Sequence, residues 1–159
     1  ADALNILAAN RHMLSLIPAG SILTPHPGEF ERLAGPWKND FERLEIQRNI
    51  AVSLKAIVVL KGAHTSIATE KGLVYFNSTG NPGMATGGTG DALTGIITGL
   101  LAQKYTPVQA AVVGVFLHGL AGDLAVLEGE MEALIASDLI GHLPQAFRKV
   151  REKKYFKDF

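Results

Sequence analysis

Apolar residues recur at helical spacing over residues 40–54, and charged residues lie between them. The pattern predicts an amphipathic helix that begins at a cap formed by Asp40. The side chains expected together on its apolar face are Phe41, Leu44, Ile50 and Leu54.

Other segments repeat the helical pattern on both sides of this one. A short helix is expected within 3–17, where Pro18 and Gly20 stop it, and another begins at 29–33 after a proline-rich turn. Beyond residue 91 the chain reads as helical almost throughout. The expected segments there are 92–103, 108–127 and 137–149, the last with a kink at Pro144.

Strands are indicated by β-branched runs between these helices. The fully apolar sequence AIVVL at 56–60 is typical of a central strand covered on both faces, and 21–24 is a brief buried strand. The segments 65–69 and 73–77 predict a hairpin through a turn at 70–72.

Helices that alternate with strands predict an α/β fold, a sheet layered by helices. The 159 residues fit one domain, 1–159, with one compact core. Few parallel strands are available to bury both faces of such a sheet, and the sequence starts without Met. We therefore expect this to be the C-terminal part of a domain whose first strands lie upstream.

Charge and composition narrow the function classes. Lys plus Arg equals Asp plus Glu at fifteen each, so no overall field attracts nucleic acid or an anionic membrane. The apolar runs are interrupted well short of a membrane span, and the absence of cysteine suits a reducing cytoplasm. We expect a cytoplasmic protein with small-molecule partners, no nucleic acid and no membrane.

The segment 77–99, NSTGNPGMATGGTGDALTGIITG, has the composition of an anion-binding loop. Its glycines allow backbone N–H groups to converge, and a helix that starts near Thr89 adds unpaired N-terminal donors. Neither a Walker loop nor a dinucleotide-binding fingerprint is present. The residues expected to contact a phosphate are Gly87, Gly88, Thr89 and Gly90.

Asp91 follows this loop directly. A carboxylate beside bound phosphate is repelled unless it has a role, such as removing a proton from a hydroxyl near the transferring phosphoryl group. The alternative is that Asp91 only caps the helix in its first turn. The whole segment favours the catalytic interpretation.

Two further clusters follow predicted strands. Lys61 lies at the carboxyl end of 56–60, where open α/β sheets bind ligands, although an isolated lysine there could simply extend into solvent. His26 and Glu29 lie in a turn stiffened by prolines, and Glu29 could contact hydrated Mg²⁺ or only begin a helix.

The remaining histidines carry no further hypothesis. His118 lies in an apolar helix and is expected to be a satisfied core residue, and His12 and His142 have no polar constellation around them in the sequence. No HExxH, no Cys or His cluster and no Ser-His-Asp arrangement is present, which disfavours zinc or triad hydrolysis.

Several motifs together closely resemble one family. The strings are ADALN, TPHPGEFERL, VLKGAHT, GNPGMATGGTGDALTGIITGLLAQ, FLHGLAGD and ASDLIGHLP. Their order and spacing resemble the ADP/ATP-dependent NAD(P)H-hydrate dehydratases, a carbohydrate-kinase-like branch of the ribokinase superfamily. GGTGD is shared by many ribokinase-like kinases, whereas HPGE together with GNPGMATGGTGD is far more selective.

The resemblance implies a ribokinase-like α/β/α fold and restoration of NADH or NADPH from its hydrate, driven by ADP or ATP. It implies that Asp91 is catalytic and contacts the substrate, that His26 also contacts the substrate, and that Glu29 acts on Mg²⁺ through water. His26 stands where ribokinase-like sugar kinases have Asn. The implied nucleotide-binding residues are Lys61, Gly62, Ala63, His64, Thr65, Asn81, Gly87, Gly88, Thr89 and Gly90.

The resemblance also implies partners. Related domains often assemble as tetramers, so a homo-oligomer is expected, and many members carry an epimerase domain upstream. Two alternatives remain open: a ribokinase-like kinase for a sugar or for a hydroxymethyl-pyrimidine or thiazole alcohol, and a non-catalytic nucleotide-binding module.

Overall fold

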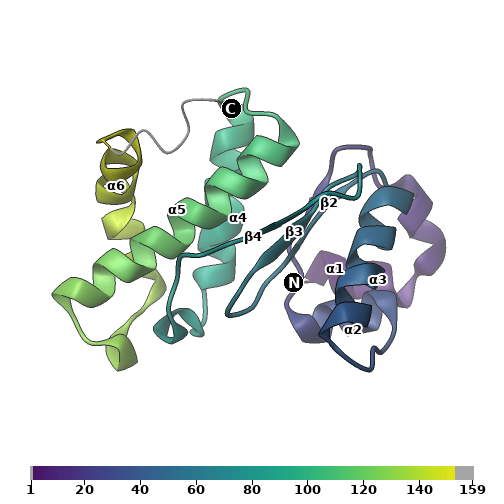
Figure 1. Ribbon diagram of the computed structural model, residues 1–159, viewed down its shortest axis with the longest axis horizontal. Coiled ribbons are helices and arrows are strands. Elements are labelled where there is room, and N and C mark those ends of the chain that lie inside the picture. Colours follow the sequence, from purple (N-terminus) through teal and green to yellow (C-terminus); the bar gives the residue numbers. More distant parts are fainter. Residues whose placement is uncertain (1, 153–159) are drawn as a thin grey trace. The chain divides into compact units, whose positions relative to one another are not determined.

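The computed structural model describes residues 2–152, and their contacts group them into two compact units. The N-terminal unit extends to Phe76, and the C-terminal unit begins at Asn77. Strands and helices occur at nearly every predicted position, which confirms a mixed α/β fold (Figure 1). The expectation of a single domain over 1–159 stays a prediction.

The N-terminal unit contains a four-stranded sheet in the order β1-β2-β3-β4. β1 (Ile22–Leu23) and β2 (Ile57–Leu60) run parallel, and the chain between them forms a helical crossover. β3 (Ser66–Ala68) and β4 (Val74–Phe76) add antiparallel strands, which confirms the predicted hairpin. Gly72 in its turn has φ +75, a conformation that L side chains rarely adopt.

The first predicted helix is divided in two. α1 (Asp2–Ala9) ends before Asn10, which leaves helical geometry at φ −126 and ψ 67, and a 3-10 helix, η1 (Arg11–Leu16), follows. The side-chain amide of Asn10 donates to the Ile6 carbonyl oxygen at 2.9 Å. An asparagine that bonds the preceding turn in this way favours a helix terminus, so the short helix expected within 3–17 is present but ends at Ala9, and the rest of the segment is a 3-10 helix.

Helix α3 (Asp40–Ser53) differs from expectation at its start and on its face. The cap is Asn39, whose side-chain oxygen accepts from the Glu42 N–H at 2.9 Å, so the predicted Asp40 cap was wrong by one residue. Phe41, expected on the apolar face, is 87% exposed. The buried residues of the helix are Gln47 and Ala51, so the core-facing side is centred on a polar side chain.

Gln47 occupies that position because it bonds to the sheet. Its Nε2 donates to the carbonyl oxygens of Val58 at 2.8 Å and of Ser66 at 3.0 Å, and its Oε1 accepts from the Ser66 hydroxyl at 2.7 Å. Fully satisfied, a buried amide stabilises one arrangement of helix and strands. Around it packs an apolar core cluster made of Phe30, Ala51, Val58, Leu60 and Ala68.

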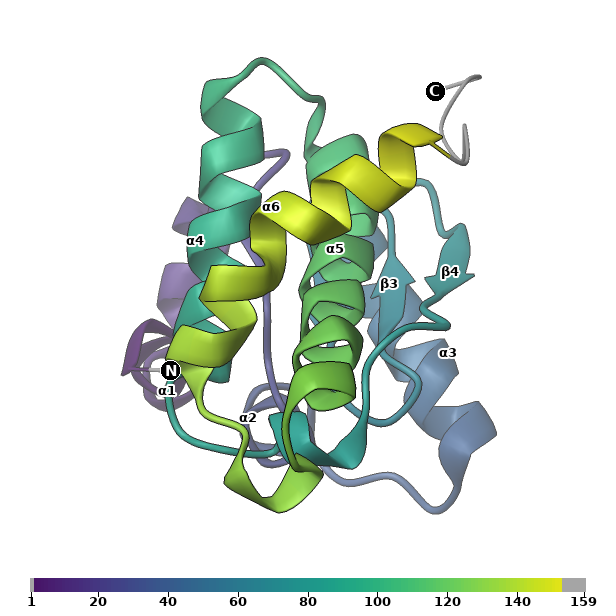
Figure 2. The same cartoon turned by 90° about the vertical axis from the view of Figure 1, so that its left-hand side faces the viewer.

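The C-terminal unit is helical. α4 (Thr89–Ala102), α5 (Pro107–Glu128) and α6 (Ala136–Glu152) confirm the three predicted helices, and α6 continues through Pro144. Figure 2 shows α6 lying across α4 and α5, in agreement with the contacts between these helices. Two short 3-10 helices, η2 (Pro82–Met84) and η3 (Met131–Ala133), were not predicted and contact each other.

Helix α5 is the long apolar helix of this unit. Thr106 caps it, Pro107 is its first residue, and Gln109 completes a capping box by accepting from the Thr106 N–H at 3.0 Å. Among residues 2–152, α5 alone is long and apolar enough to cross a membrane, which corrects the expectation that every apolar run stops well short of a span. Because 61% of its apolar window is buried, as in the core helix of a soluble protein, length and composition support a membrane span only weakly.

Candidate functional site

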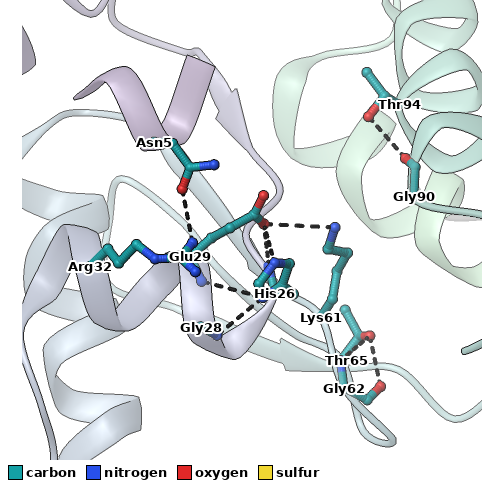
Figure 3. A network of polar contacts seen from close by, with 10 residues as sticks. All are labelled: Asn5, His26, Gly28, Glu29, Arg32, Lys61, Gly62, Thr65, Gly90 and Thr94. Atoms are coloured by element: carbon teal, nitrogen blue, oxygen red, sulfur yellow. Dashed lines mark hydrogen bonds and ion pairs between the residues drawn. The ribbon is translucent and has the colours of Figure 1, made fainter. Parts of the chain in front are cut away.

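The predicted site residues fall into two clusters, one in each unit. In the N-terminal unit, the cluster lies at the carboxyl ends of the parallel strands β1 and β2, where open sheets place ligand-binding loops. The Lys61 N–H donates to the Pro25 carbonyl oxygen at 2.9 Å, which joins the end of β2 to the turn after β1. The structure therefore brings His26, Glu29 and Lys61 together (Figure 3).

His26 caps helix α2 (Pro27–Ala34) with its ring. Nδ1 accepts from the Gly28 N–H at 3.1 Å and from the Glu29 N–H at 3.3 Å. Glu29 returns the contact, since its Oε2 accepts from the His26 N–H at 2.8 Å. This reciprocal arrangement is a capping box with histidine in the place usually taken by Ser or Thr, and half of the His26 side chain stays exposed.

Glu29 is the buried member of the cluster, with a side chain only 5% exposed. Its Oε2 lies 3.6 Å from His26 Nε2 and 4.0 Å from Lys61 Nζ. Burial raises the pKa of Glu29, but hydrogen bonds to the ionised carboxylate, that of the His26 N–H among them, and nearby positive charge together outweigh burial. The Glu29 pKa therefore lies below its usual value, and the carboxylate is charged at neutral pH.

These contacts determine whether the Glu29 carboxylate could coordinate a Mg²⁺ ion directly. A buried carboxylate that accepts a capping hydrogen bond and faces a lysine ammonium does not fit direct coordination of a hydrated cation. Within the described part of the chain, no group of three or more His, Asp or Glu side chains could hold a metal. The water-mediated contact predicted for Glu29 stays a prediction.

The predicted nucleotide segment 61–65 forms a tight turn between β2 and β3. The Thr65 hydroxyl donates to the Gly62 carbonyl oxygen at 3.1 Å and accepts from the Gly62 N–H at 3.3 Å. Gly62, Ala63 and His64 are exposed at its tip. A turn closed by its own threonine presents its tip in one defined shape, which suits a binding loop.

The second cluster is the glycine-rich loop of the C-terminal unit and the start of α4. Gly88 is the N-cap residue of α4 at φ +88, and no side chain caps the helix there. The Thr89 hydroxyl bonds backward, to the carbonyl oxygens of Met84 and Thr86 at 2.9 Å each. The first N–H groups of α4 are thus left for solvent or an anion, as a phosphate cradle requires.

Asp91 is the third residue of α4 and is exposed. Because Gly88 holds the cap position, Asp91 is not the N-cap, although the helix dipole still favours its negative charge. It lies with Gly88 at one end of a groove of about 540 Å³ between α4 and α6. Most of this groove is apolar, and Ile96, Leu143 and Phe147 are among its lining residues.

His118 and His142 both have polar contacts, but only those of His142 differ from the sequence expectation. His118, expected to be a satisfied core residue, has its Nε2 at 2.8 Å from the Thr89 carbonyl oxygen, so it is satisfied by the first turn of α4. His142 does have polar neighbours, which corrects the sequence interpretation. Its Nε2 lies 3.2 Å from Glu128 Oε2, and its Nδ1 lies 2.7 Å from the Asp138 carbonyl oxygen.

Asp123 is the residue that sequence reasoning passed over. Its carboxylate accepts from the Gly80 N–H at 2.9 Å and from the Asn81 side-chain amide at 3.0 Å. The signal was present, because a carboxylate inside an otherwise apolar, largely buried helix needs a polar partner. The partner could not be found from the sequence, since it lies 43 residues upstream in an irregular loop.

Comparison with known proteins identifies the family. The sequence profile of the NAD(P)H-hydrate dehydratases matches residues 1–145. The chain belongs to the NAD(P)H-hydrate dehydratase family. A bifunctional NAD(P)H-hydrate repair enzyme of Moorella thermoacetica is 48% identical over 155 residues, which cover 96% of this chain and 29% of that protein. The ADP-dependent (S)-NAD(P)H-hydrate dehydratase of Bacillus subtilis is 41% identical and covers 80% and 47%.

Solved structures support the assignment of this chain to the NAD(P)H-hydrate dehydratase family. The B. subtilis ADP/ATP-dependent NAD(P)H-hydrate dehydratase, co-crystallised with ATP/Mg²⁺, superposes with TM-score 0.75 at 40% identity, over 80% of this chain and 47% of that one. A ribokinase-like superfamily protein of Enterococcus faecalis gives TM-score 0.80 at 32% identity, over 94% and 51%. The predicted ribokinase-like fold is confirmed, and the chain spans 29% to 51% of these relatives.

Proposed function

We propose that this chain takes part in nucleotide-dependent dehydration of NAD(P)H hydrate back to NAD(P)H. The observation that carries the proposal is the start of α4, where uncapped backbone N–H groups and the exposed Asp91 occur within one helical turn. Such a turn binds a phosphoryl group and holds a proton acceptor beside it. Relatives named as NAD(P)H-hydrate dehydratases and repair enzymes supply the substrate class.

In the proposed reaction, Asp91 accepts the proton of the hydrate's hydroxyl group. The hydroxyl oxygen then bonds to the terminal phosphorus of ADP or ATP as the bond from that phosphorus to its bridging oxygen breaks. Phosphate leaves from the ring with the bonding electrons, and loss of a ring proton restores the double bond. The amides at Thr89 and Gly90 stabilise charge on the transferring group.

The residues of the N-terminal unit have binding roles in this proposal. Lys61 and the turn 62–65 bind the adenine nucleotide, and the exposed half of the His26 ring contacts the hydrated nicotinamide. Glu29 keeps both neighbours in place through the capping box and the lysine contact. Mg²⁺, which accompanied ATP in crystals of the B. subtilis relative, would be brought by the nucleotide phosphates.

The test is recovery of NADH absorbance from NADH hydrate, with Mg²⁺ and either ADP or ATP, and with nucleotide-free reactions as controls. Both this chain and the complete product of its gene are assayed, since the relatives are longer. Nucleotide-dependent recovery in either supports the proposal. A stable phosphorylated product from a sugar or a hydroxymethyl heterocycle, without recovery, would instead establish a small-molecule kinase. Nucleotide binding with no turnover would establish a binding module.

A further inference from the structure

The loop that leads into α4 is held by one face of α5. The Thr79 hydroxyl donates to the Phe116 carbonyl oxygen at 2.9 Å. Gly119 and Gly122 allow the loop to approach closely: a Cβ on Gly119 would lie 2.6 Å from the carbonyl carbon of Thr79, and one on Gly122 would lie 2.8 Å from Met84 Cγ. Helix α5 therefore acts as a rigid support along the loop from Thr79 to Met84.

Asp123 is the charged group on that support. Its Oδ2 accepts from the Gly80 N–H at 2.9 Å, and its Oδ1 accepts from Asn81 Nδ2 at 3.0 Å. Hydrogen bonds to an ionised acceptor are stronger than those between neutral groups, so this pair of contacts outweighs an ordinary turn interaction. Gly80 has φ +105, and the bond to Asp123 holds the chain in that unusual conformation.

The contact with Asp123 also fixes the orientation of the Asn81 amide. With Nδ2 turned to Asp123, Oδ1 faces the other way and accepts from the Gly83 N–H at 3.1 Å. This second bond caps η2, and the last residue of η2, Met84, accepts from the Thr89 hydroxyl at 2.9 Å. A continuous series of contacts thus runs from Asp123 to the first residue of α4.

We propose that Asp123 is a positioning residue that, through Asn81, sets the path of loop 79–84 and so the start of α4 with Asp91. Asn81, which the family resemblance suggested as a nucleotide contact, acts in this proposal through its two bonds within the loop. The inference rests on the proposed dehydratase function for its effect on turnover, whereas its effect on the loop is independent of that function.

An exchange of the two side chains tests this. In Asp123→Asn the new amide keeps its oxygen for the Gly80 N–H, so its NH2 group faces the NH2 group of Asn81 and two donors meet. Rotation of the Asn81 amide by half a turn would remove that conflict but would place the Asn81 NH2 group against the Gly83 N–H, which is also a donor. In Asn81→Asp two carboxylates face each other. The double variant Asn81→Asp, Asp123→Asn restores every bond. Its amide at position 123 can accept from the Gly80 N–H and donate to the carboxylate at position 81, which still accepts from Gly83. Glu130→Gln, at an exposed acid after α5, is the matched control.

Two measurements are made on wild type and on all four variants. Amide hydrogen exchange at Gly80 and Gly83 reports the loop directly, and kcat and KM for NADH hydrate and ADP report the site. Each single variant of the pair should lose protection at both amides and lose on the order of 10²-fold in kcat/KM, chiefly in kcat, as expected for misplaced catalytic groups. The double variant should regain both, and Glu130→Gln should match wild type.

Two results would overturn the inference. If the double variant exchanges as fast as the single variants, the pair does not set the loop. If exchange is restored but KM for ADP stays high, the Asn81 side chain binds the nucleotide itself, and the positioning role assigned to it is wrong. If wild type fails to recover NADH, the proposed function fails, while the exchange data still decide whether Asp123 holds the loop.

Discussion

The side chains of His26 and Glu29 each accept a hydrogen bond from the backbone N–H of the other residue. His26 Nδ1 accepts from the Glu29 N–H at 3.3 Å, and Glu29 Oε2 accepts from the His26 N–H at 2.8 Å. A histidine that caps a helix with Nδ1 leaves Nε2 as its other polar atom, which here lies 3.6 Å from Glu29 Oε2 on a ring that is half exposed. One side chain can therefore start α2 and still face a ligand.

Substitution of His26 separates these two roles. His26→Ala removes the acceptor of the capping box and should lower the free energy of unfolding by about 1 kcal/mol. His26→Asn should keep most of the stability, because asparagine caps helices well. Urea unfolding of both variants measures the difference.

If the ring contacts substrate, both variants should raise KM for NADH hydrate to a similar extent, with little effect on KM for the nucleotide. Equal substrate KM in His26→Asn and wild type would show that His26 is only a cap. The exposed His12 provides the control substitution, His12→Asn.

Gln47 should be among the most costly polar positions to replace in the N-terminal unit. In Gln47→Leu, the Val58 and Ser66 carbonyl oxygens lose a donor and the buried Ser66 hydroxyl loses its acceptor. A buried polar group left unsatisfied costs about 1–3 kcal/mol. We therefore expect Gln47→Leu to lower the free energy of unfolding by at least about 2 kcal/mol, as measured by chemical denaturation. Asn49→Ala, at an exposed position of the same helix, should change stability little.

Gln47 also illustrates what the sequence could and could not predict. Spacing located α3 to within a residue, because hydrophobic periodicity and a polar cap are local signals. The face was misassigned because the hypothesis placed Phe41 inside on hydrophobicity alone, whereas the buried position is held by an amide with partners on two strands. Long-range satisfaction of polar groups is not visible in a local pattern.

The same distinction applies to the candidate site. GGTGD and HPGE were found because their chemistry lies in adjacent residues. Asp123 was missed because its partners lie in a loop far upstream, and the contacts of His142 were missed because its carboxylate partner belongs to a different helix. Sequence patterns therefore identified the groups proposed to do the chemistry, and the structure was needed to find those that hold them in place.

Two glycines should respond to alanine in opposite directions. On α5, a Cβ at Gly119 would meet the backbone of Thr79 at 2.6 Å, so Gly119→Ala must displace the loop or the helix. We expect Gly119→Ala to lower the free energy of unfolding by about 1–3 kcal/mol. On α4, a Cβ at Gly99 meets nothing within 4 Å, and Gly99→Ala should stabilise by about 0.5–1 kcal/mol through helix propensity. Thermal unfolding of both variants checks the sign, and a neutral Gly119→Ala would contradict the close approach.

His142 should make the stability of the C-terminal unit depend on pH. The bond to the Asp138 carbonyl raises the pKa of His142 above 6.5, burial opposes this, and Glu128 adds to the increase. The group favours the folded state when protonated, so its contribution is complete below pH 6.5 and is lost as pH rises through the folded-state pKa. The stability difference between wild type and His142→Asn should thus be larger at about pH 5.5 than at about pH 8.5.

Glu128→Gln refines this test. It removes the carboxylate that faces His142 Nε2 at 3.2 Å but leaves the Asp138 carbonyl in place. The pH dependence should therefore shrink without vanishing, because the backbone contact is the larger cause of the raised pKa. If the stability of His142→Asn depends on pH as strongly as that of wild type, titratable groups other than His142 cause the pH dependence.

Asp91 carries the chemical proposal and needs a variant that changes charge but little else. Asp91→Asn keeps the size of the side chain at an exposed position in the first turn of α4, so the fold should be retained. If Asp91 accepts the substrate proton, kcat should fall by about 10²–10⁴-fold, while affinity for ADP should stay the same or rise as a negative charge beside the phosphate is lost. Thr98→Ala, at an exposed position farther along α4, should leave both unchanged. Full turnover in Asp91→Asn would assign proton removal to another group and reduce Asp91 to a favourable charge at the helix start.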